Sequence, residues 1–321
     1  MKNSCEKSHN YFLIEQQLKC RTTFVLGMPN TLIIEPGAVC SLHCRFCPQS
    51  KSDFDFSRDL LSFADFKKII RQFEPYLDTI LLFNWGEPLM NPEITKMIRF
   101  AADKSIRSLL HSHLNILDSA KAESLVASGL FELVASIDGA SQATYALYRE
   151  GGSFERAIAN LRLLQEKKKK LKSDTPRLVW KFLVFRHNQE EMESARLMAQ
   201  DLGVEIEFKL AVTDGTLSST LEEYSSENLP GKFIKHYGLP CEQLWRAPVI
   251  HSDGMVLPCC MISSARYSVG NLFREDFREI WNNAAYRRIR EAASGKVDPD
   301  ESVFCYYCMF GSRQRKGGIN A

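Results

Sequence analysis

Between residues 31 and 212 the sequence alternates short apolar segments, rich in β-branched and aromatic residues, with segments of helical periodicity. A strand that leads through a helix into another strand usually pairs with it in parallel, through a right-handed crossover. The segments expected to form strands are residues 31–35, 79–85, 108–114, 132–138, 177–185 and 205–212. Six such units predict an α/β fold, either an open wound sheet or a partial (β/α)6 barrel.

Helix-terminating residues agree with this alternation. Asp118 can cap a helix that ends at Gly129, and Ser153 can cap the helix that runs into the lysines at 167–170. Lysines in a last helical turn are favoured by the helix dipole and by water, so this run is not taken as a nucleic-acid site.

The composition excludes several classes of protein. The 321 residues carry 41 basic and 39 acidic side chains, a formal net charge of +2, which argues against bulk electrostatic binding of nucleic acid or an acidic membrane. No run of 18 apolar residues predicts a transmembrane helix, and the N-terminus lacks the apolar stretch of a signal peptide. We therefore expect a cytoplasmic protein, where clustered cysteines bind metals or catalyse rather than form disulfides.

After residue 212 the sequence changes character. A polar, Ser-rich stretch indicates a linker or lid at 213–240. The Asp253-Gly254 turn between two apolar segments predicts a β-hairpin, and one helix is expected from Asp276 to about Ser294. The expected packing face of that helix consists of Phe277, Ile280, Trp281 and Tyr286. The expected domains are an N-terminal extension at 1–30, the barrel at 31–212, the linker at 213–240 and a small domain at 241–321.

The ten cysteines fall into an early and a late group, with none between residues 48 and 240. Cys40, Cys44 and Cys47 follow the first expected strand at C-x3-C-x2-C spacing, where a barrel of this type places its reactive groups. Four thiolates saturate a tetrahedral metal or a cubane cluster, so three leave one position open for chemistry. The alternative is a zinc site completed by His43 or a distant residue.

This spacing, with Phe46 at the aromatic position, resembles the C-x3-C-x-aromatic-C signature of the radical S-adenosylmethionine (SAM) superfamily. The resemblance implies a partial (β/α)6 TIM-like barrel and a [4Fe–4S] cluster held by Cys40, Cys44 and Cys47, with SAM bound to the fourth iron. It also implies reductive cleavage of SAM to a 5′-deoxyadenosyl radical, which takes a hydrogen atom from the substrate. In such enzymes the cofactor carries the difficult chemistry, and the protein positions and shields it.

The segment FNWGEP, residues 83–88, ends the second expected strand, where the superfamily has a GGEP segment. The resemblance implies that Gly86, Glu87 and Asn84 contact the methionine part of SAM. Trp85 departs from the pattern, because it replaces the first glycine. The alternative interpretation of this segment is an ordinary turn at the end of a strand.

The segment that begins SIDG, at residue 136, also resembles the superfamily. It implies that Ser136 and Asp138 lie near the SAM ribose and that Arg149 can meet a carboxylate, although Arg149 can equally be a surface arginine. His111 and His113, at the end of the third expected strand, should point to one face of it. Each is either a packed, hydrogen-bonded histidine or a catalytic one.

The late cysteines carry a second resemblance. Cys241, Gly254 and Cys259 have the spacing that opens the SPASM and Twitch auxiliary-cluster domains of radical SAM enzymes, and the pair Cys305 and Cys308 continues it. The resemblance implies a small Twitch/SPASM-like domain in which Cys241, Cys259, Cys305 and Cys308 ligate an auxiliary [4Fe–4S] cluster. No cysteine follows Cys308, which favours the shorter Twitch pattern with one auxiliary cluster. A zinc ribbon with the same four ligands is the alternative.

The remaining cysteines are interpreted individually. Alternation along a strand would send Cys260 to the face opposite Cys259, where it is either a small buried hydrophobe or a thiol that gives a hydrogen atom to a substrate radical. Cys5 and Cys20 are assigned no role.

The resemblance implies an oxidoreductase, similar to the aminocyclitol dehydrogenases of butirosin biosynthesis, that oxidises a sugar- or cyclitol-like small molecule. The alternatives are a peptide-modifying radical SAM enzyme that forms thioethers or epimerises residues, a small-molecule epimerase that uses Cys260, and a non-catalytic zinc or iron–sulfur protein. The expected partners are a small molecule or peptide as substrate and a flavodoxin or ferredoxin-type electron donor, with neither nucleic acid nor membrane. The candidate catalytic residues are His111, His113, Arg149 and Cys260, and the proton acceptor is not ranked among His111, His113, Arg149, Glu150 and Asp214.

Overall fold

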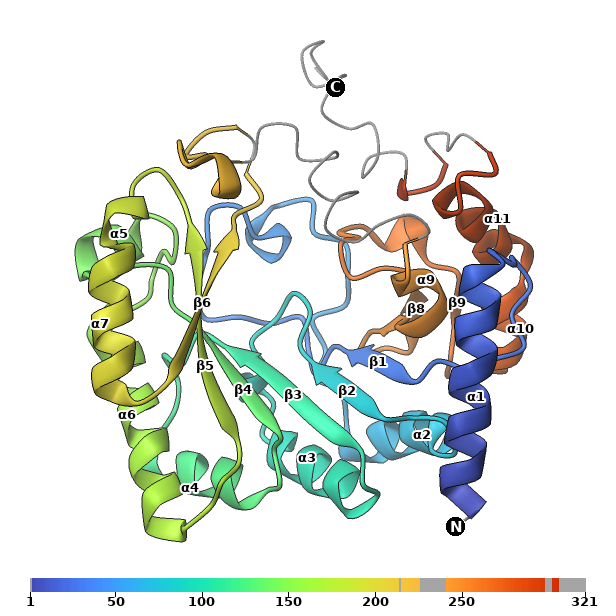
Figure 1. Ribbon diagram of the computed structural model, residues 1–321, viewed down its shortest axis with the longest axis horizontal. Helices are drawn as coiled ribbons and strands as arrows, with labels where there is room; N and C mark the ends of the chain where they lie inside the picture. The colour runs from blue at the N-terminus through green and yellow to red at the C-terminus, as the bar shows by residue number, and fades with distance from the viewer. Residues whose placement is uncertain (1, 214, 226–240, 298–301, 306–321) are drawn as a thin grey trace.

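A computed structural model describes residues 2–213, 215–225, 241–297 and 302–305. Nine strands of these residues form one sheet in the order β6-β5-β4-β3-β2-β1-β7-β8-β9 (Figure 1). The strands of its first part are β1 (Thr31–Ile34), β2 (Thr79–Leu82), β3 (Arg107–Ser112), β4 (Glu132–Ser136), β5 (Arg177–Val184) and β6 (Glu205–Leu210). All neighbours among these six pair in parallel. The predicted α/β fold and partial barrel are therefore confirmed.

Each of the six strands ends one to three residues before its expected end. The residues left over, among them Glu35, Phe83, His113, Asp138 and Phe185, follow the carboxyl ends of parallel strands and enter the loops at one edge of the sheet. The alternation of apolar and polar residues continues past the last hydrogen bond between neighbouring strands. For this reason the sequence pattern predicts strands that are longer than those observed.

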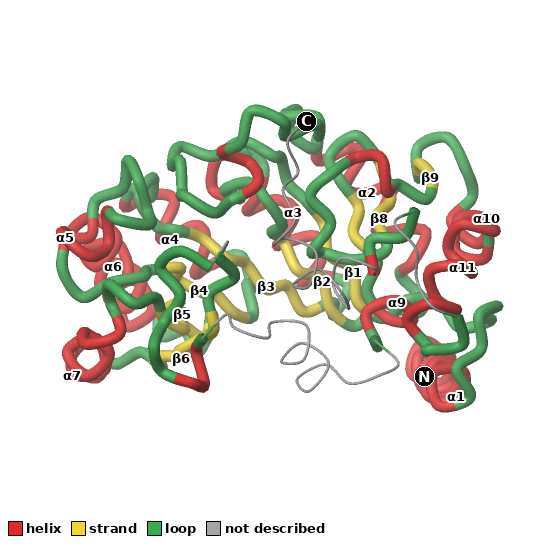
Figure 2. The backbone as a smooth tube through the Cα atoms, turned by 90° about the horizontal axis from the view of Figure 1, so that it is seen from above, coloured by secondary structure: helices red, strands yellow, loops and turns green. Residues whose placement is uncertain are grey.

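Helices cover the outer side of this curved sheet (Figure 2). They are α2 (Phe63–Phe73), α3 (Ile94–Asp103), α4 (Ser119–Ala127), α5 (Gln142–Ala146), α6 (Phe154–Leu171) and α7 (Met192–Leu202). The expected caps form, because the Asp118 side chain accepts the Lys121 N–H and the Ser153 side chain accepts the Arg156 N–H. Alternate strand residues pack against the apolar stripes of these helices and make the main core.

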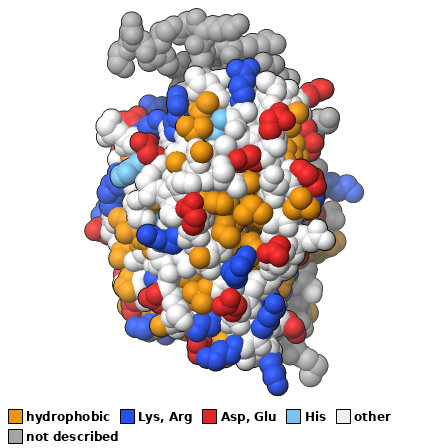
Figure 3. All heavy atoms as spheres, turned by 90° about the vertical axis from the view of Figure 1, so that its left-hand side faces the viewer, with side chains coloured by type: hydrophobic (Ala, Val, Ile, Leu, Met, Phe, Trp, Pro, Cys, Tyr) orange, Lys and Arg blue, Asp and Glu red, His pale blue; other side chains and the backbone are white. Residues whose placement is uncertain are grey.

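On the face over α6 and α7, acidic and basic side chains are interspersed (Figure 3). Arg162 of α6 pairs with Asp201 of α7, and Lys167 and Lys170 pair with Glu123. This arrangement agrees with the interpretation of the lysine run as a solvated helix end. In the part of the chain that the structure describes, no helix has the length and apolar character needed to cross a membrane.

The C-terminal part continues the same sheet. Strand β7 (Val249–Ile250) pairs in parallel with β1, and β8 (Met255–Leu257) and β9 (Gly270–Asn271) follow in antiparallel order. The predicted Asp253-Gly254 hairpin is present, with Gly254 at a φ of 84° that favours glycine. The barrel and the auxiliary-cluster region therefore share one set of backbone hydrogen bonds.

The single helix expected from Asp276 to about Ser294 is wrong, because the segment forms two helices, α10 (Phe277–Asn282) and α11 (Ala284–Ala293). Asn283 is extended between them. Its Oδ1 caps α11 by accepting the Tyr286 N–H, and its Nδ2 donates to Val269 O at 2.7 Å. A residue that caps a new helix and bonds a distant carbonyl cannot continue the preceding helix. The expected packing face is confirmed, since all four of its side chains are buried.

Helix α1 (Lys2–Lys19), to which the sequence pattern assigned no structure, packs beside α9 (Gln243–Arg246) (Figure 1). The buried Asn10 amide exchanges two hydrogen bonds with the backbone of Met28, and the Trp281 indole donates to Gly27 O at 2.9 Å. The first thirty residues are thus joined to the C-terminal helices.

Candidate functional site

The loop after β1 carries the early cysteines. Cys44 is 5% exposed, and Cys40 and Cys47 are half-buried. The loop is tied to the segment after α5, because His43 N–H donates to Glu150 O at 3.0 Å and Arg45 N–H donates to Tyr148 O at 3.2 Å. The His43 side chain is exposed, whereas the neighbouring Cys44 is buried. His43 therefore does not point in the same direction as the Cys44 thiol.

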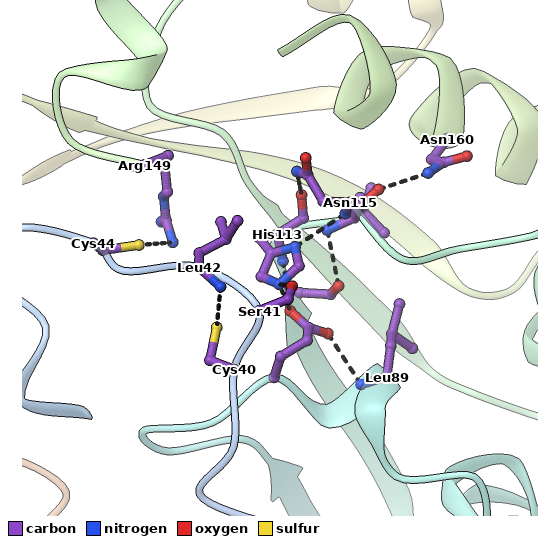
Figure 4. Close-up of polar contacts among 12 residues, drawn as sticks. Cys40, Ser41, Leu42, Cys44, Leu89, His113, Asn115, Arg149 and Asn160 are labelled. Atoms are coloured by element: carbon purple, nitrogen blue, oxygen red, sulfur yellow. Dashed lines mark hydrogen bonds and ion pairs between the residues drawn. The ribbon is translucent and has the colours of Figure 1, made fainter. Parts of the chain in front are cut away.

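Arg149 lies directly against the cysteine loop (Figure 4). Its Nε donates to Asp138 Oδ2 at 2.6 Å, and its Nη1 lies 3.8 Å from Cys44 Sγ. Burial raises the pKa of the Cys44 thiol, and the guanidinium charge of Arg149 opposes this rise. Arg149 therefore supplies positive charge next to the early cysteine thiols. It is not the surface arginine that the sequence left as an alternative.

The other predicted residues of the β4 edge lie close by. Asp138 is fully buried, and its Oδ1 accepts the Leu183 N–H at 2.7 Å while its Oδ2 accepts Arg149. Ser136 is buried one pleat below it. Both carboxylate oxygens of Asp138 are thus engaged by the protein, so this residue orients Arg149.

Glu87 and His113 form a buried pair, and His113 lies beside Ser41 of the same loop (Figure 4). Glu87 Oε2 accepts the His113 backbone N–H at 2.9 Å and lies 3.3 Å from His113 Nε2, while Oε1 accepts the Leu89 N–H. His113 Nδ1 accepts the Asn115 N–H at 3.0 Å, and Ser41 Oγ is 3.3 Å from Nε2. Burial lowers the pKa of His113, against the carboxylate of Glu87. A neutral His113 with its proton on Nε2 satisfies all of these contacts.

The backbone of the 83–88 segment approaches the cysteine loop closely. A Cβ placed on Gly86 would lie 1.9 Å from Gly37 O, so no other residue fits there without moving the loop. Beneath this contact the fully buried Glu35 accepts N–H groups of Trp85 at 2.5 Å, Gly86 at 3.1 Å and Gly37 at 3.4 Å. Burial raises the pKa of Glu35, and these three hydrogen bonds oppose the rise.

Trp85 and Asn84 turn toward the C-terminal region. The Trp85 indole Nε1 donates to Ile262 O at 2.9 Å, and the Asn84 amide lies 3.4 Å from His251 Nε2. Trp85 packs against the apolar cluster of Ile33, Phe56, Val249, Leu257 and Ile262, and Cys259 and Cys260 pack against the same cluster. The residue that departs from the GGEP pattern therefore joins the 83–88 segment to the loop of the late cysteines.

Phe46 packs with two aromatic rings beside the early cysteines. Its ring centroid is 6.1 Å from those of Tyr148 and Phe185, and the three rings lie in one apolar group with Leu42 and Cys44. His111 has different contacts from His113. It faces the inner side of β3, stacks on Phe83 and contacts Lys181.

The late cysteines lie on two segments. Cys259 follows β8, and its thiol is close enough to Cys241, just before α9, for charge on one to raise the pKa of the other. Cys241 and Cys305 both pack against the main core. Cys308 and Asp214 lie outside the described residues. Glu150 is exposed and contributes its backbone carbonyl to the cysteine loop.

The expectation that Cys260 points away from Cys259 is wrong. The strand β8 ends at Leu257, so alternation no longer applies, and the two thiols hydrogen-bond to each other. That hydrogen bond, followed by burial, raises the pKa of Cys259, whereas the same hydrogen bond lowers the pKa of Cys260 against the effect of burial. Cys260 thus belongs to the late cysteine loop.

Several residues of this site were given no functional role from the sequence: Glu35, Lys181, Tyr148 and Tyr286, the last of which was expected only as a packing residue. Two of them carried a signal, since Glu35 ends the apolar segment TLIIE and Lys181 interrupts the apolar segment RLVWKFLV. A charged residue inside a buried strand needs a partner or a function.

Comparisons with known proteins agree with this geometry. The sequence profile of the Radical SAM superfamily matches residues 34–197, and that of SPASM, an iron–sulfur cluster-binding domain, matches residues 241–309. An AdoMet-dependent heme synthase of Methanosarcina barkeri is 25% identical over 308 residues, which cover 82% of this chain and 85% of that protein.

Two solved structures share the fold. Streptococcus suis SuiB bound to its precursor peptide SuiA has a TM-score of 0.65 at 16% identity, covering 88% of this chain and 71% of that one. BtrN in complex with AdoMet and 2-DOIA has a TM-score of 0.54 at 16% identity, covering 86% of this chain and 95% of that one.

The residues present fit two [4Fe–4S] clusters and SAM. Among the described residues no three Cys, His, Asp or Glu side chains converge on one point as ligands of a single ion. A cubane cluster does not need this, because each of its cysteines binds a different iron. The first donor set is three thiols beside Arg149, which suits a cluster with one iron left for SAM.

The second donor set has an unpaired neighbour. The buried Tyr286 hydroxyl, whose pKa burial raises, has no hydrogen-bond partner among the described residues and feels the charge of Cys259. A cluster sulfur would accept this hydroxyl. With thiols and donors arranged in this way at both loops, and with the superfamily profile matching half of its length, the chain belongs to the radical SAM superfamily and carries a SPASM domain.

Proposed function

We propose that this radical SAM enzyme is an oxidoreductase that removes two hydrogens from a small polar molecule of the sugar or cyclitol kind. The observation that carries the proposal is the hydrogen bond from Trp85 Nε1 to Ile262 O, which joins the SAM-contacting segment to the auxiliary-cluster loop. An auxiliary cluster held beside the site of hydrogen abstraction suits a reaction in which the substrate must give up an electron.

When bound, SAM and the two clusters supply a 5′-deoxyadenosyl radical that takes one hydrogen atom, and an acceptor for the electron that the substrate radical loses with its proton. The protein's own residues orient these groups. Cys40, Cys44 and Cys47 would hold the first cluster, and Arg149 places positive charge beside them. Glu35 holds the backbone of residues 85 and 86 toward the cysteine loop.

Of the four candidate catalytic side chains, His111 is the one that we retain for substrate contact. His113 is engaged with Glu87, Arg149 with Asp138, and Cys260 with Cys259. His111 instead faces the inner side of β3 and keeps part of its surface accessible. We also propose that a flavodoxin or ferredoxin-type protein supplies the electron that starts each turnover.

The test is anaerobic incubation of the reconstituted enzyme with SAM, a strong reductant and candidate polyols. Oxidation predicts a product two hydrogens lighter and one 5′-deoxyadenosine for each product. Unchanged mass with an inverted stereocentre contradicts oxidation and supports an epimerase that uses a thiol. Absence of 5′-deoxyadenosine with every substrate contradicts the proposal as a whole.

A second substrate class is favoured by the relative from Methanosarcina barkeri, which covers most of this chain and is named as a heme synthase. We therefore include an iron tetrapyrrole with carboxylate side chains as a separate arm of the assay. A peptide substrate, favoured by the fold of SuiB, forms a third arm. Turnover of a cysteine-containing peptide, with a new thioether or an inverted residue, would replace the oxidation proposal.

A further inference from the structure

Lys181 lies in the middle of β5, on the inner side of the sheet. Its neighbours on the strand, Trp180 and Phe182, are fully buried in the main core under the helices. Side chains alternate along a strand, so Lys181 points to the opposite face. Leu183, the next residue on that inner face, packs against the apolar group that contains Cys44, as do Cys40 and Cys47. Lys181 is therefore one pleat below the group of residues around the first cluster.

The Lys181 ammonium forms no ion pair among the described residues. Two nearby carboxylates are already engaged, since Asp138 pairs with Arg149 at 2.6 Å and Glu207 pairs with Lys209 at 3.1 Å. Burying an ammonium without a carboxylate costs free energy, and burial lowers the pKa of Lys181 to about 8. A charge retained at such a position is explained most simply by an anion that binds there.

His111 supplies a second donor beside Lys181. Lys181 Nζ lies 3.2 Å from His111 Nδ1, and burial lowers the pKa of His111 well below its usual range, so the ring is neutral. An Nδ1 that accepts from an ammonium leaves the proton on Nε2, which is then a donor. The ring is held flat on Phe83, with centroids 3.6 Å apart and planes 9° apart.

We propose that Lys181 and the Nε2–H of His111 bind an anionic group of the substrate, a carboxylate or a phosphate, on the inner face of the sheet. The inference rests on the proposed function and narrows its substrate to the acidic members of the class. Ser136 is the register partner of Lys181 on β4, so an anion held there brings the adjoining carbon atoms toward the expected SAM contacts. Charge-assisted hydrogen bonds of this kind contribute more than neutral ones.

The test uses the full-length holoenzyme, reconstituted anaerobically and saturated with SAM, without reductant. Isothermal titration compares glucose, glucuronate and glucose 6-phosphate, which share a ring and differ in the group at C6. We expect at least one of the two anions to bind at least about tenfold more tightly than glucose. Lys181→Met should abolish this preference, and Lys181→Arg should keep it. His111→Phe should retain the stack on Phe83 and weaken the preference.

Lys96→Met is the matched control, because Lys96 is an exposed lysine on α3 that already has a partner, Glu93. It should leave the preference unchanged. The proposal is overturned if neither anion binds better than glucose, or if Lys181→Met keeps the preference. An equal loss of SAM affinity in Lys181→Met also overturns it, since Lys181 would then serve the cofactor. This binding experiment uses no reductant and does not depend on SAM cleavage. If the separate turnover assay showed no SAM cleavage, that result would contradict the proposed function and would not affect the binding result.

Discussion

Buried charged side chains orient the candidate site, and Glu35 is an example of how one of them acts. Its carboxylate accepts three backbone N–H groups, two of them from the segment expected to contact SAM. No base or nucleophile is needed at this position. Because the donors belong to Trp85, Gly86 and Gly37, Glu35 fixes the backbone on both sides of the closest approach between the two loops.

Replacing Glu35 with Gln should weaken SAM binding by about tenfold. An amide presents one oxygen and one N–H₂ group, so at least one buried N–H loses its acceptor at a cost of about 1–3 kcal/mol. Equilibrium dialysis of the reconstituted protein with SAM measures this. Glu166→Gln, an exposed position on α6, is the matched control. SAM affinity that is unchanged in Glu35→Gln would show that the loop keeps its position without this carboxylate.

The proposed anion site predicts a pH dependence. Because the pKa of Lys181 is lowered to about 8, the ammonium is present below that pH and is lost above it. For an acidic substrate, kcat/KM should fall about tenfold per pH unit above pH 8. The charged or titratable groups that act on Lys181 are His111, Arg149, Asp138, Glu207 and Lys209. In Lys181→Arg, which stays protonated, the fall should disappear. An identical fall in that variant would assign the titration to another group.

The strands and loops show how two distant motifs come together. The 83–88 segment and the late cysteine loop are about 170 residues apart in the sequence, yet β2 and β7 both pair with β1, and β8, which leads into the late cysteine loop, pairs with β7 in the same sheet. The Trp85 indole connects the two segments by donating to Ile262 O. A glycine at this position, as in the superfamily pattern, could not make that contact.

Replacing Trp85 with Phe should uncouple SAM cleavage from product formation. The substitution keeps an aromatic ring but removes the hydrogen bond to Ile262 O, worth about 1 kcal/mol, so the two loops are held less firmly. We expect several molecules of 5′-deoxyadenosine for each product, with unchanged iron content.

Trp180→Phe serves as the control, because the Trp180 indole donates to Ile137 O at 2.7 Å in the core beneath the helices. Trp180→Phe should lower the free energy of unfolding by a similar amount and keep the ratio of 5′-deoxyadenosine to product near one. Equal ratios in the two variants would argue that Trp85 has a packing role alone.

The molecule as a whole is held together at its C-terminal end by Arg290. This guanidinium is fully buried and stacks over Trp281 and Tyr286. It donates to the carbonyls of Leu244, Thr23 and Trp281, which belong to α9, the N-terminal segment and α10. Burial lowers the pKa of Arg290 to about 10. Three separate parts of the chain thus depend on one side chain.

Replacing Arg290 with Met should lower the free energy of unfolding by about 3 kcal/mol, because three buried carbonyls lose their donor. Urea unfolding followed by circular dichroism measures this. Arg287→Met, one turn earlier on the exposed side of α11, should change stability by less than about 0.5 kcal/mol. If the two variants were equally stable, the carbonyls would have found other donors.

Local pattern was enough to predict the six parallel strands, the caps of α4 and α6, the hairpin and the two cysteine motifs. These features depend on neighbouring residues, whose periodicity and spacing are visible in one dimension. The split at Asn283, the pairing of β7 with β1, the orientation of Cys260 and the contact between Lys181 and His111 could not be predicted in this way. Each depends on groups brought together by folding, as when Val269 O lies within reach of Asn283 or β3 and β5 present their inner faces to each other. The sequence motifs were thus sufficient to predict the radical chemistry. The groups that would select the substrate could be identified only from the tertiary structure, because folding brings them together.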